Sequence, residues 1–253
     1  MKILVTNDDG IDALGLRRLE EALRREFDVL VCAPDREQSA ASHSLSLSRP
    51  LRLMNRGEGR WACDGTPTDC VLIAKYELYK GANPDLIISG INHGQNMGED
   101  VTYSGTIAAA IEGSILGIPS IAASLIEGDD RTHTEETFAA AAQFLARFVK
   151  AHREFEIPPT TFLNINFPDL AGAEYSQYQF TRLGLRVFND VVIQRTDPRG
   201  GRYYWIAGEP DWTEIEGSDY STTQKGVISV TPLRVNFDDG ETLGRLGESV
   251  CSL

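Results

Sequence analysis

The sequence predicts an α/β fold built around a mostly parallel sheet. An apolar, β-branched run at residues 2–6 is followed by helical spacing of leucines over residues 11–27 and by a second apolar run at residues 28–33. Strand, helix and strand within the first 33 residues form a βαβ unit, which places the two strands parallel with a right-handed crossover. Further apolar runs at residues 85–89, 120–125 and 161–167 alternate with helical patterns and extend the same sheet.

The helices between these runs have recognisable starts. Thr66 caps a helix that should run to about Lys80, because Pro67 suits the first helical position and Asp69 completes a capping box. A helix rich in small residues is expected over 105–117, and a long amphipathic helix over 132–155. Weak alternation at residues 45–54 and 61–63 indicates an excursion of short strands. Residues 178–183 indicate a further strand.

The pattern changes after Gly184, which divides the chain into a core at residues 1–184 and an extension at residues 185–253. Residues 187–206 predict two strands around the turn Asp197-Pro198-Arg199-Gly200-Gly201. A polar loop is expected at residues 211–225, a strand returning at 227–235 and a short helix at 241–252. A hairpin too small to bury its own face packs on something else, either a partner subunit or its own core.

Composition excludes several classes of protein. The formal net charge of −13 argues against binding a nucleic-acid polymer, which calls for a basic face. The four cysteines, Cys32, Cys63, Cys70 and Cys251, have no zinc spacing and are interpreted as incidental thiols. The sequence also has no leader peptide pattern and no membrane span, so a cytoplasmic, reduced protein is expected.

Polar residues cluster where the predicted strands end. Asp8 and Asp9 follow the first strand, residues 33–44 follow the second, and residues 89–96 follow the third. Ligands bind at the carboxyl ends of the strands in open α/β sheets, so these segments should meet. They offer carboxylate, hydroxyl and amide oxygens, which suit a hard divalent cation such as Mg²⁺, Mn²⁺ or Ca²⁺. The alternative is a polar turn in which Asp8 and Asp9 cap the next helix.

Ser104-Gly105-Thr106 lies at a predicted helix start. Free N–H groups there, with a glycine that allows close approach, form an anion site. A hard cation beside an anion site indicates phosphoryl chemistry. Ordinary helix capping by Ser104 or Thr106 is the alternative.

Taken in order, several motifs resemble the survival protein SurE family of metal-dependent nucleoside monophosphate phosphatases. The resemblance runs nearly end to end, and no single motif decides it. The motifs are Asn7-Asp8-Asp9-Gly10, Ala33-Pro34-Asp35-Arg36 with Ser39, Gly65-Thr66-Pro67-Thr68-Asp69-Cys70, Ser89-Gly90-Ile91-Asn92-His93-Gly94-Gln95-Asn96, Tyr103-Ser104-Gly105-Thr106, Leu163-Asn164-Ile165-Asn166-Phe167-Pro168 and residues 226–233.

The resemblance implies a Rossmann-like three-layer core and a C-terminal hairpin exchanged within a homodimer or homotetramer. It implies hydrolysis of nucleoside 5'- and 3'-monophosphates, and of short polyphosphate in some members. One divalent cation would be held by Asp8, Asp9, Ser39 and Asn92, and the phosphate would be bordered by Asn96, Ser104, Gly105 and Thr106. Asp8 or Asp9 could also act as a base or a nucleophile.

Other interpretations stay open at this point. His43, in the second loop, could transfer a proton to the leaving group or serve as a structural hydrogen-bond donor. A phospho-receiver domain would need an acceptor aspartate after the third strand, where this chain has Ser89 and Asn92. A haloacid-dehalogenase-like phosphatase would need Asp-x-Asp after the first strand, and a dinucleotide-dependent oxidoreductase would need a glycine-rich fingerprint there.

Overall fold

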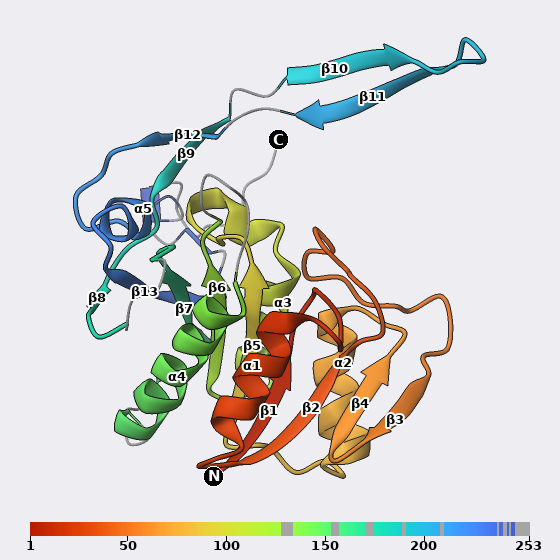
Figure 1. Ribbon diagram of the computed structural model, residues 1–253, viewed down its shortest axis with the longest axis vertical. Helices are drawn as coiled ribbons and strands as arrows, with labels where there is room; N and C mark the ends of the chain where they lie inside the picture. Colours follow the sequence, from red (N-terminus) through yellow and green to blue (C-terminus); the bar gives the residue numbers. More distant parts are fainter. Residues whose placement is uncertain are drawn as a thin grey trace.

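The fold confirms the predicted α/β class. The computed structural model describes residues 1–127, 134–152, 157–170, 175–188, 191–207, 210–236, 238, 239, 242, 244 and 245. In this part of the chain, a nine-stranded sheet has the order β3-β4-β2-β1-β5-β6-β7-β13-β8. Figure 1 shows α1 and α4 on one face of this sheet and α2 and α3 on the other, which makes three layers.

Parallel pairing dominates the sheet. β4, β2, β1, β5, β6 and β7 pair in parallel, whereas β13 runs antiparallel to β7 and β3 antiparallel to β4. The strands are β1 (Lys2–Thr6), β2 (Asp28–Pro34), β3 (Leu53–Gly57), β4 (Arg60–Cys63), β5 (Leu86–His93), β6 (Ser120–Leu125), β7 (Thr161–Phe167), β8 (Tyr178–Phe180) and β13 (Ile228–Arg234). The helices are α1 (Leu14–Leu23), α2 (Pro67–Ile73), α3 (Gly105–Ile115), α4 (Glu135–Ala151) and α5 (Asp219–Thr223).

Two helix starts show how local sequence positions the layers. The capping box of α2 is present as predicted, with Thr66 and Asp69 each bonding the other's backbone N–H. The helix continues as a π-helical turn at Ala74–Leu78. At the start of α1, a Cβ on Gly15 would lie 2.0 Å from the carbonyl oxygen of Ile91. Only glycine therefore lets α1 lie this close to the end of β5.

β5 is longer than the sequence predicts. We expected a strand at residues 85–89 followed by a loop, and the structure continues β5 to His93. The pairing with β6 shifts register between Ser89 and Asn92, where Gly90 adopts a φ of +136°. A bulge of this kind interrupts the regular alternation of side chains along the strand. Hydrophobic periodicity therefore does not predict that the strand continues beyond it. The short strands predicted at residues 45–54 and 61–63 are confirmed as β3 and β4, but the first of them begins only at Leu53.

The extension after the core forms an arm. Figure 1 shows it projecting away from the sheet, with β10 (Val191–Thr196) paired to β11 (Arg202–Ala207) at the far end. β9 (Leu185–Phe188) and β12 (Pro210–Thr213) pair at its base, so four short strands replace the two expected. Across the described residues, no helix is both long and apolar enough to cross a membrane.

The predicted polar loop at residues 211–225 is wrong, since it contains β12 and α5. Asp219 is fully buried, and its carboxylate accepts hydrogen bonds from the backbone N–H groups of Gly98, Gly184 and Tyr220. These bonds let a polar segment fold inside the protein. The predicted strand at 227–235 is confirmed as β13, whereas most of the predicted helix at 241–252, with Cys251, lies outside the described residues.

Candidate functional site

The carboxyl ends of β1 and β2 are joined through their backbones. The Gln38 N–H donates to the Asp8 carbonyl oxygen at 2.7 Å, and the Ile11 N–H donates to the Pro34 carbonyl oxygen at 2.8 Å. Gly10, with a φ of +102°, lies against the backbone of Arg36. The turn after β1 and the loop after β2 therefore meet at the same edge, as the parallel topology requires.

Asp8 is the centre of the site. Its side chain is only 4% exposed, and the Thr106 hydroxyl donates to Oδ1. The same hydroxyl oxygen lies 3.3 Å from Oδ1 of Asn92. A Cβ on Gly105 would lie 2.9 Å from Asp8 Oδ2, so the start of α3 approaches the carboxylate as closely as a glycine allows. The ends of β1 and β5 and the N-terminus of α3 thus converge on one carboxylate.

Asp9 faces the same region and carries a perturbed pKa. The His93 N–H donates to Asp9 Oδ2 at 3.2 Å. Burial, and then the charge of Asp8, raise the pKa of Asp9 from 3.8 to about 7. Burial also raises the pKa of Asp8, against the hydrogen bond from Thr106. Two carboxylates that each resist ionisation form a place where a cation would be electrostatically favoured.

The Asn92 side chain has a defined orientation. Its Nδ2 donates to the carbonyl oxygen of Gly94 at 2.8 Å and to that of His93 at 3.2 Å. With the amide nitrogen engaged on that side, Oδ1 is turned toward Thr106 and Asp8. Asn92 therefore adds an amide oxygen, and not an amide nitrogen, to the oxygen atoms of the two carboxylates at this site.

The loop after β2 places Ser39 next to this cluster without engaging it. The Ser39 side chain is exposed, and its hydroxyl donates to Glu37 Oε1 at 2.7 Å. Its neighbour Gln38 is held by the backbone of Asp8.

The predicted phosphate-binding residues divide into two groups. Gly105 and Thr106 lie against Asp8, whereas the Ser104 hydroxyl accepts from the Ile107 N–H at 3.1 Å and caps α3. The Asn96 side chain is buried and donates to the Ser124 hydroxyl at 2.8 Å. Ser104 and Asn96 therefore shape the site. Backbone hydrogen bonds from Gly105 and Thr106 direct the N-terminal dipole of α3 at the Asp8 carboxylate.

Comparison with known proteins identifies the family. The model of the survival protein SurE family matches residues 3–190. The chain belongs to this family. The 5'-nucleotidase SurE of Pelobacter propionicus is 48% identical over 238 residues, covering 94% of each chain, and that of Geobacter metallireducens is 44% identical over 247 residues, covering 97% of this chain and 96% of the relative. The crystal structure of the SurE protein from Aquifex aeolicus matches with a TM-score of 0.85 at 38% identity, covering 97% of this chain and 98% of that one.

The residues of this SurE-family chain fit a divalent cation. The donors that the strand ends bring together are carboxylate and amide oxygens, with a serine hydroxyl on the adjoining loop. They include no soft ligand, as Mg²⁺ or Mn²⁺ prefers. The absence of a Cβ at Gly105 also lets the helix terminus lie directly against the Asp8 carboxylate.

His43 lies at the rim of an adjoining cavity. The backbone N–H and hydroxyl of Ser42 donate to the carbonyl oxygens of Tyr103 and Thr102, which docks the loop beside Ser104. Nε2 of His43 lies 2.9 Å from Oε2 of Glu112, a nearly buried residue of α3. The cavity between this loop, α3 and β13 has a volume of about 350 Å³.

Sequence reasoning assigned no role at the site to three residues that lie around it. Glu112 pairs with His43, and Asn164 and Asn166 of β7 both donate to the Asn96 carbonyl oxygen. One signal was present, since Asn164 and Asn166 place two amides on one side of an otherwise apolar, fully buried strand. Buried amides of this kind need partners, and here the partner is the loop that carries the site.

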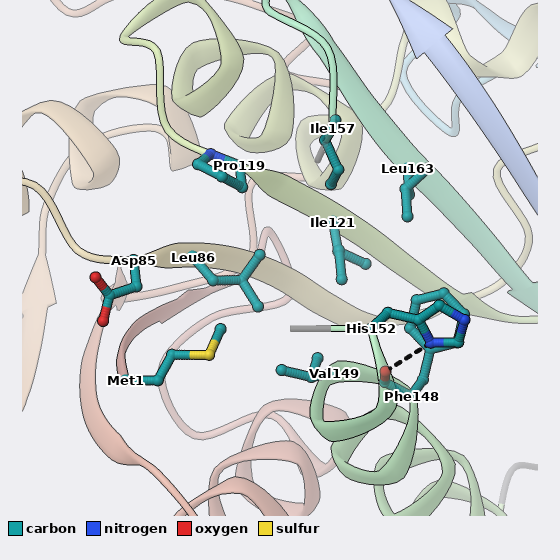
Figure 2. Close-up of a pocket in the computed structure, with 10 residues that line it drawn as sticks. All are labelled: Met1, Asp85, Leu86, Pro119, Ile121, Phe148, Val149, His152, Ile157 and Leu163. Atoms are coloured by element: carbon teal, nitrogen blue, oxygen red, sulfur yellow. Dashed lines mark hydrogen bonds between the residues drawn. The ribbon is translucent and has the colours of Figure 1, made fainter. Parts of the chain in front are cut away.

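A second cavity lies at the opposite end of the sheet and is not a candidate active site. Figure 2 shows Met1 and Leu86 across from Phe148 and Val149 of α4 and from His152, the residue that follows this helix. His152 is held by its own helix, with Nδ1 2.9 Å from the carbonyl oxygen of Phe148. The volume of about 90 Å³ is the space of about three water molecules, too small for a nucleotide.

Proposed function

We propose that this protein is a divalent-metal-dependent 5'-nucleotidase, which hydrolyses nucleoside monophosphates to nucleoside and inorganic phosphate. One observation carries the proposal: a buried carboxylate, Asp8, meets the Gly105–Thr106 start of α3. That arrangement supports a cation held by oxygen ligands beside a helix N-terminus that favours an anion. The relatives named 5'-nucleotidase SurE, similar over almost the whole chain, support the same reaction.

In this proposal Asp8, Asp9, Ser39 and Asn92 hold one Mg²⁺ or Mn²⁺ ion. When bound, the ion supplies charge neutralisation for the phosphoryl group and Lewis acidity toward water. The N–H groups at the start of α3 orient the phosphoryl oxygens. Thr106 fixes the Asp8 carboxylate by donating to Oδ1, so that Asp8 together with Asp9 would hold the ion.

The proposal extends to 3'-monophosphates and short polyphosphate. It is supported by the N-terminus of α3, whose dipole favours the negative charge of a phosphoryl group whatever base the substrate carries. A cytoplasmic location is also proposed. It is supported by Cys32, Cys63 and Cys70, which are buried free thiols.

We also propose that the arm assembles two copies of the chain. On β10 and β11, Trp205 is 64% exposed, Ile206 86% and Val192 62%. Large apolar residues exposed together on a hairpin mark a protein interface. Light scattering of the purified protein should give at least twice the mass of 27.9 kDa, and a monomer at all concentrations would contradict this part of the proposal.

The activity is tested by measuring inorganic phosphate released from nucleoside 5'-monophosphates, 3'-monophosphates and short polyphosphate. Activity with Mn²⁺ or Mg²⁺ should disappear after chelation and return when the ion is restored. Asp12→Asn is the matched control for substitution of Asp8, because Asp12 is an exposed carboxylate of the same turn. Equal rates with and without chelator would reject the metal-dependent reaction.

A further inference from the structure

The loop between β5 and α3 carries a buried peptide group outside any helix or strand. Asn96 is only 5% exposed, and its backbone bonds to side chains of a different strand. Its N–H donates to Oδ1 of Asn166 at 2.9 Å, and its carbonyl oxygen accepts from Nδ2 of the same residue at 3.0 Å. The Asn166 amide thus imitates a neighbouring peptide group of a sheet.

A second amide completes this arrangement. Nδ2 of Asn164 donates to the same Asn96 carbonyl oxygen at 2.8 Å, so that oxygen accepts two hydrogen bonds. Asn164 and Asn166 are two residues apart on β7 and therefore share a face, and both are fully buried. Buried backbone groups need partners, and here β7 supplies them through side chains.

The held segment includes the hydrogen-bond acceptor of the Asn92 side chain. The Gly94 carbonyl oxygen, two residues before Asn96, accepts from Nδ2 of Asn92. The Gly94 N–H donates to the Leu125 carbonyl oxygen at 2.9 Å, and the Gly98 N–H donates to Asp219. The loop is therefore fixed at alternate residues from β6, β7 and α5. Without the contacts from β7, the Asn96 peptide would lose its bonds while the Asn96 side chain kept its bond to Ser124, so the Gly94 carbonyl that accepts from Asn92 would be less firmly oriented.

We propose that Asn164 and Asn166 are positioning residues that hold the loop so that Asn92 presents its amide oxygen, and not its nitrogen, to the cation. The inference rests on the proposed metal-dependent function. An amide that rotates would aim its N–H₂ donors at the ion, which repels them. Groups behind a metal ligand typically change metal affinity or activity about 10- to 100-fold when altered.

Asn166→Asp tests this with little change in shape. It replaces the donor Nδ2 with an acceptor that faces the Asn96 carbonyl oxygen. We expect the dissociation constant for Mn²⁺, measured on the full chain by electron paramagnetic resonance, to rise by about 10-fold or more. At saturating Mn²⁺, KM for the nucleotide should stay close to the wild-type value, because the N-terminus of α3 is untouched.

Ser120→Ala is the matched control. Ser120 is fully buried on β6, and its hydroxyl donates to the Ile118 carbonyl oxygen at 2.9 Å at the other end of the sheet. The control should lower the melting temperature and leave Mn²⁺ affinity unchanged. If Asn166→Asp fails to fold, Asn164→Ala carries the test, because it removes one donor and leaves the Asn166 pair intact.

The outcomes separate this inference from the proposed function. A folded Asn166→Asp or Asn164→Ala variant with wild-type Mn²⁺ affinity and a lower melting temperature would overturn the positioning role. A wild-type protein that neither binds Mn²⁺ nor hydrolyses nucleotides would instead reject the proposed function. Weakened Mn²⁺ affinity in both asparagine variants, with the Ser120 control unchanged, supports the inference.

Discussion

Gly105→Ala changes the site by a single methyl group. The new Cβ would lie 2.8 Å from Cβ and 2.9 Å from Oδ2 of Asp8, about 0.6 Å closer than ordinary contact. Overpacking of this kind costs roughly 1–3 kcal/mol, and alanine recovers roughly 0.5–1 kcal/mol in a helix. We therefore expect a net loss of about 0–2.5 kcal/mol in the free energy of unfolding, a fall of about 0–10 °C in melting temperature for a chain of this size.

Activity should fall much more than stability. Displacing the Asp8 carboxylate by about 0.6 Å disturbs its bond with Thr106, and a misplacement of about 1 Å can reduce a rate about 100-fold. We expect phosphate release from a nucleoside 5'-monophosphate with Mn²⁺ to fall about 10- to 100-fold. The assay pairs this rate with thermal unfolding of the same sample.

Gly113→Ala on the same helix is the control. Its Cβ would lie 2.2 Å from the Ser120 hydroxyl oxygen and 2.8 Å from Ile87, away from the carboxylates. It should destabilise the protein and leave the rate of the folded fraction near wild type. The reasoning is refuted if Gly105→Ala folds normally and retains a rate within about threefold of wild type.

Three further predictions concern the acidic residues. Asp8→Asn should abolish turnover and leave the circular dichroism spectrum unchanged, since it removes charge with little change in shape; residual activity near wild type would contradict this. Because the pKa of Asp9 is raised from 3.8 to about 7, its contribution to the stability of the metal-free protein is present below about pH 4 and lost as the pH rises through about 7. Urea unfolding of Asp9→Asn should lack this part of the pH dependence, and identical curves for both proteins would argue against it. Asp219→Asn should cost roughly 1–3 kcal/mol in denaturant unfolding, because one carboxylate oxygen facing the N–H groups of Gly98, Gly184 and Tyr220 becomes an N–H₂ donor; an unchanged midpoint would contradict this.

Much of the core could be predicted from sequence because its signals are local. Apolar runs identify β1, β2, β6 and β7, and the capping box at Thr66 identifies the start of α2. Parallel strands bring their carboxyl ends to one edge, so Asp8, Asp9 and Asn92 could be placed together from chain order alone.

The arm and the segment after it were harder to predict. Residues 211–225 are polar and lack periodicity, yet Asp219, Ser221, Thr222 and Thr223 are buried. Their burial depends on partners more than 30 residues away along the chain, such as Gly98 and Gly184. No local pattern encodes those partners.

The sequence by itself determined the class of fold, the order of the strands' polar ends and the kind of oxygen ligands available, because periodicity, capping and side-chain chemistry are properties of short segments. Only the tertiary structure decided which way each ligand faces. The Asn92 nitrogen is bonded to the Gly94 carbonyl, and the backbone of Asn96, two residues further on, is bonded to two amides of β7. Such orientation depends on hydrogen bonds between residues about 70 positions apart, which form only when the sheet has assembled.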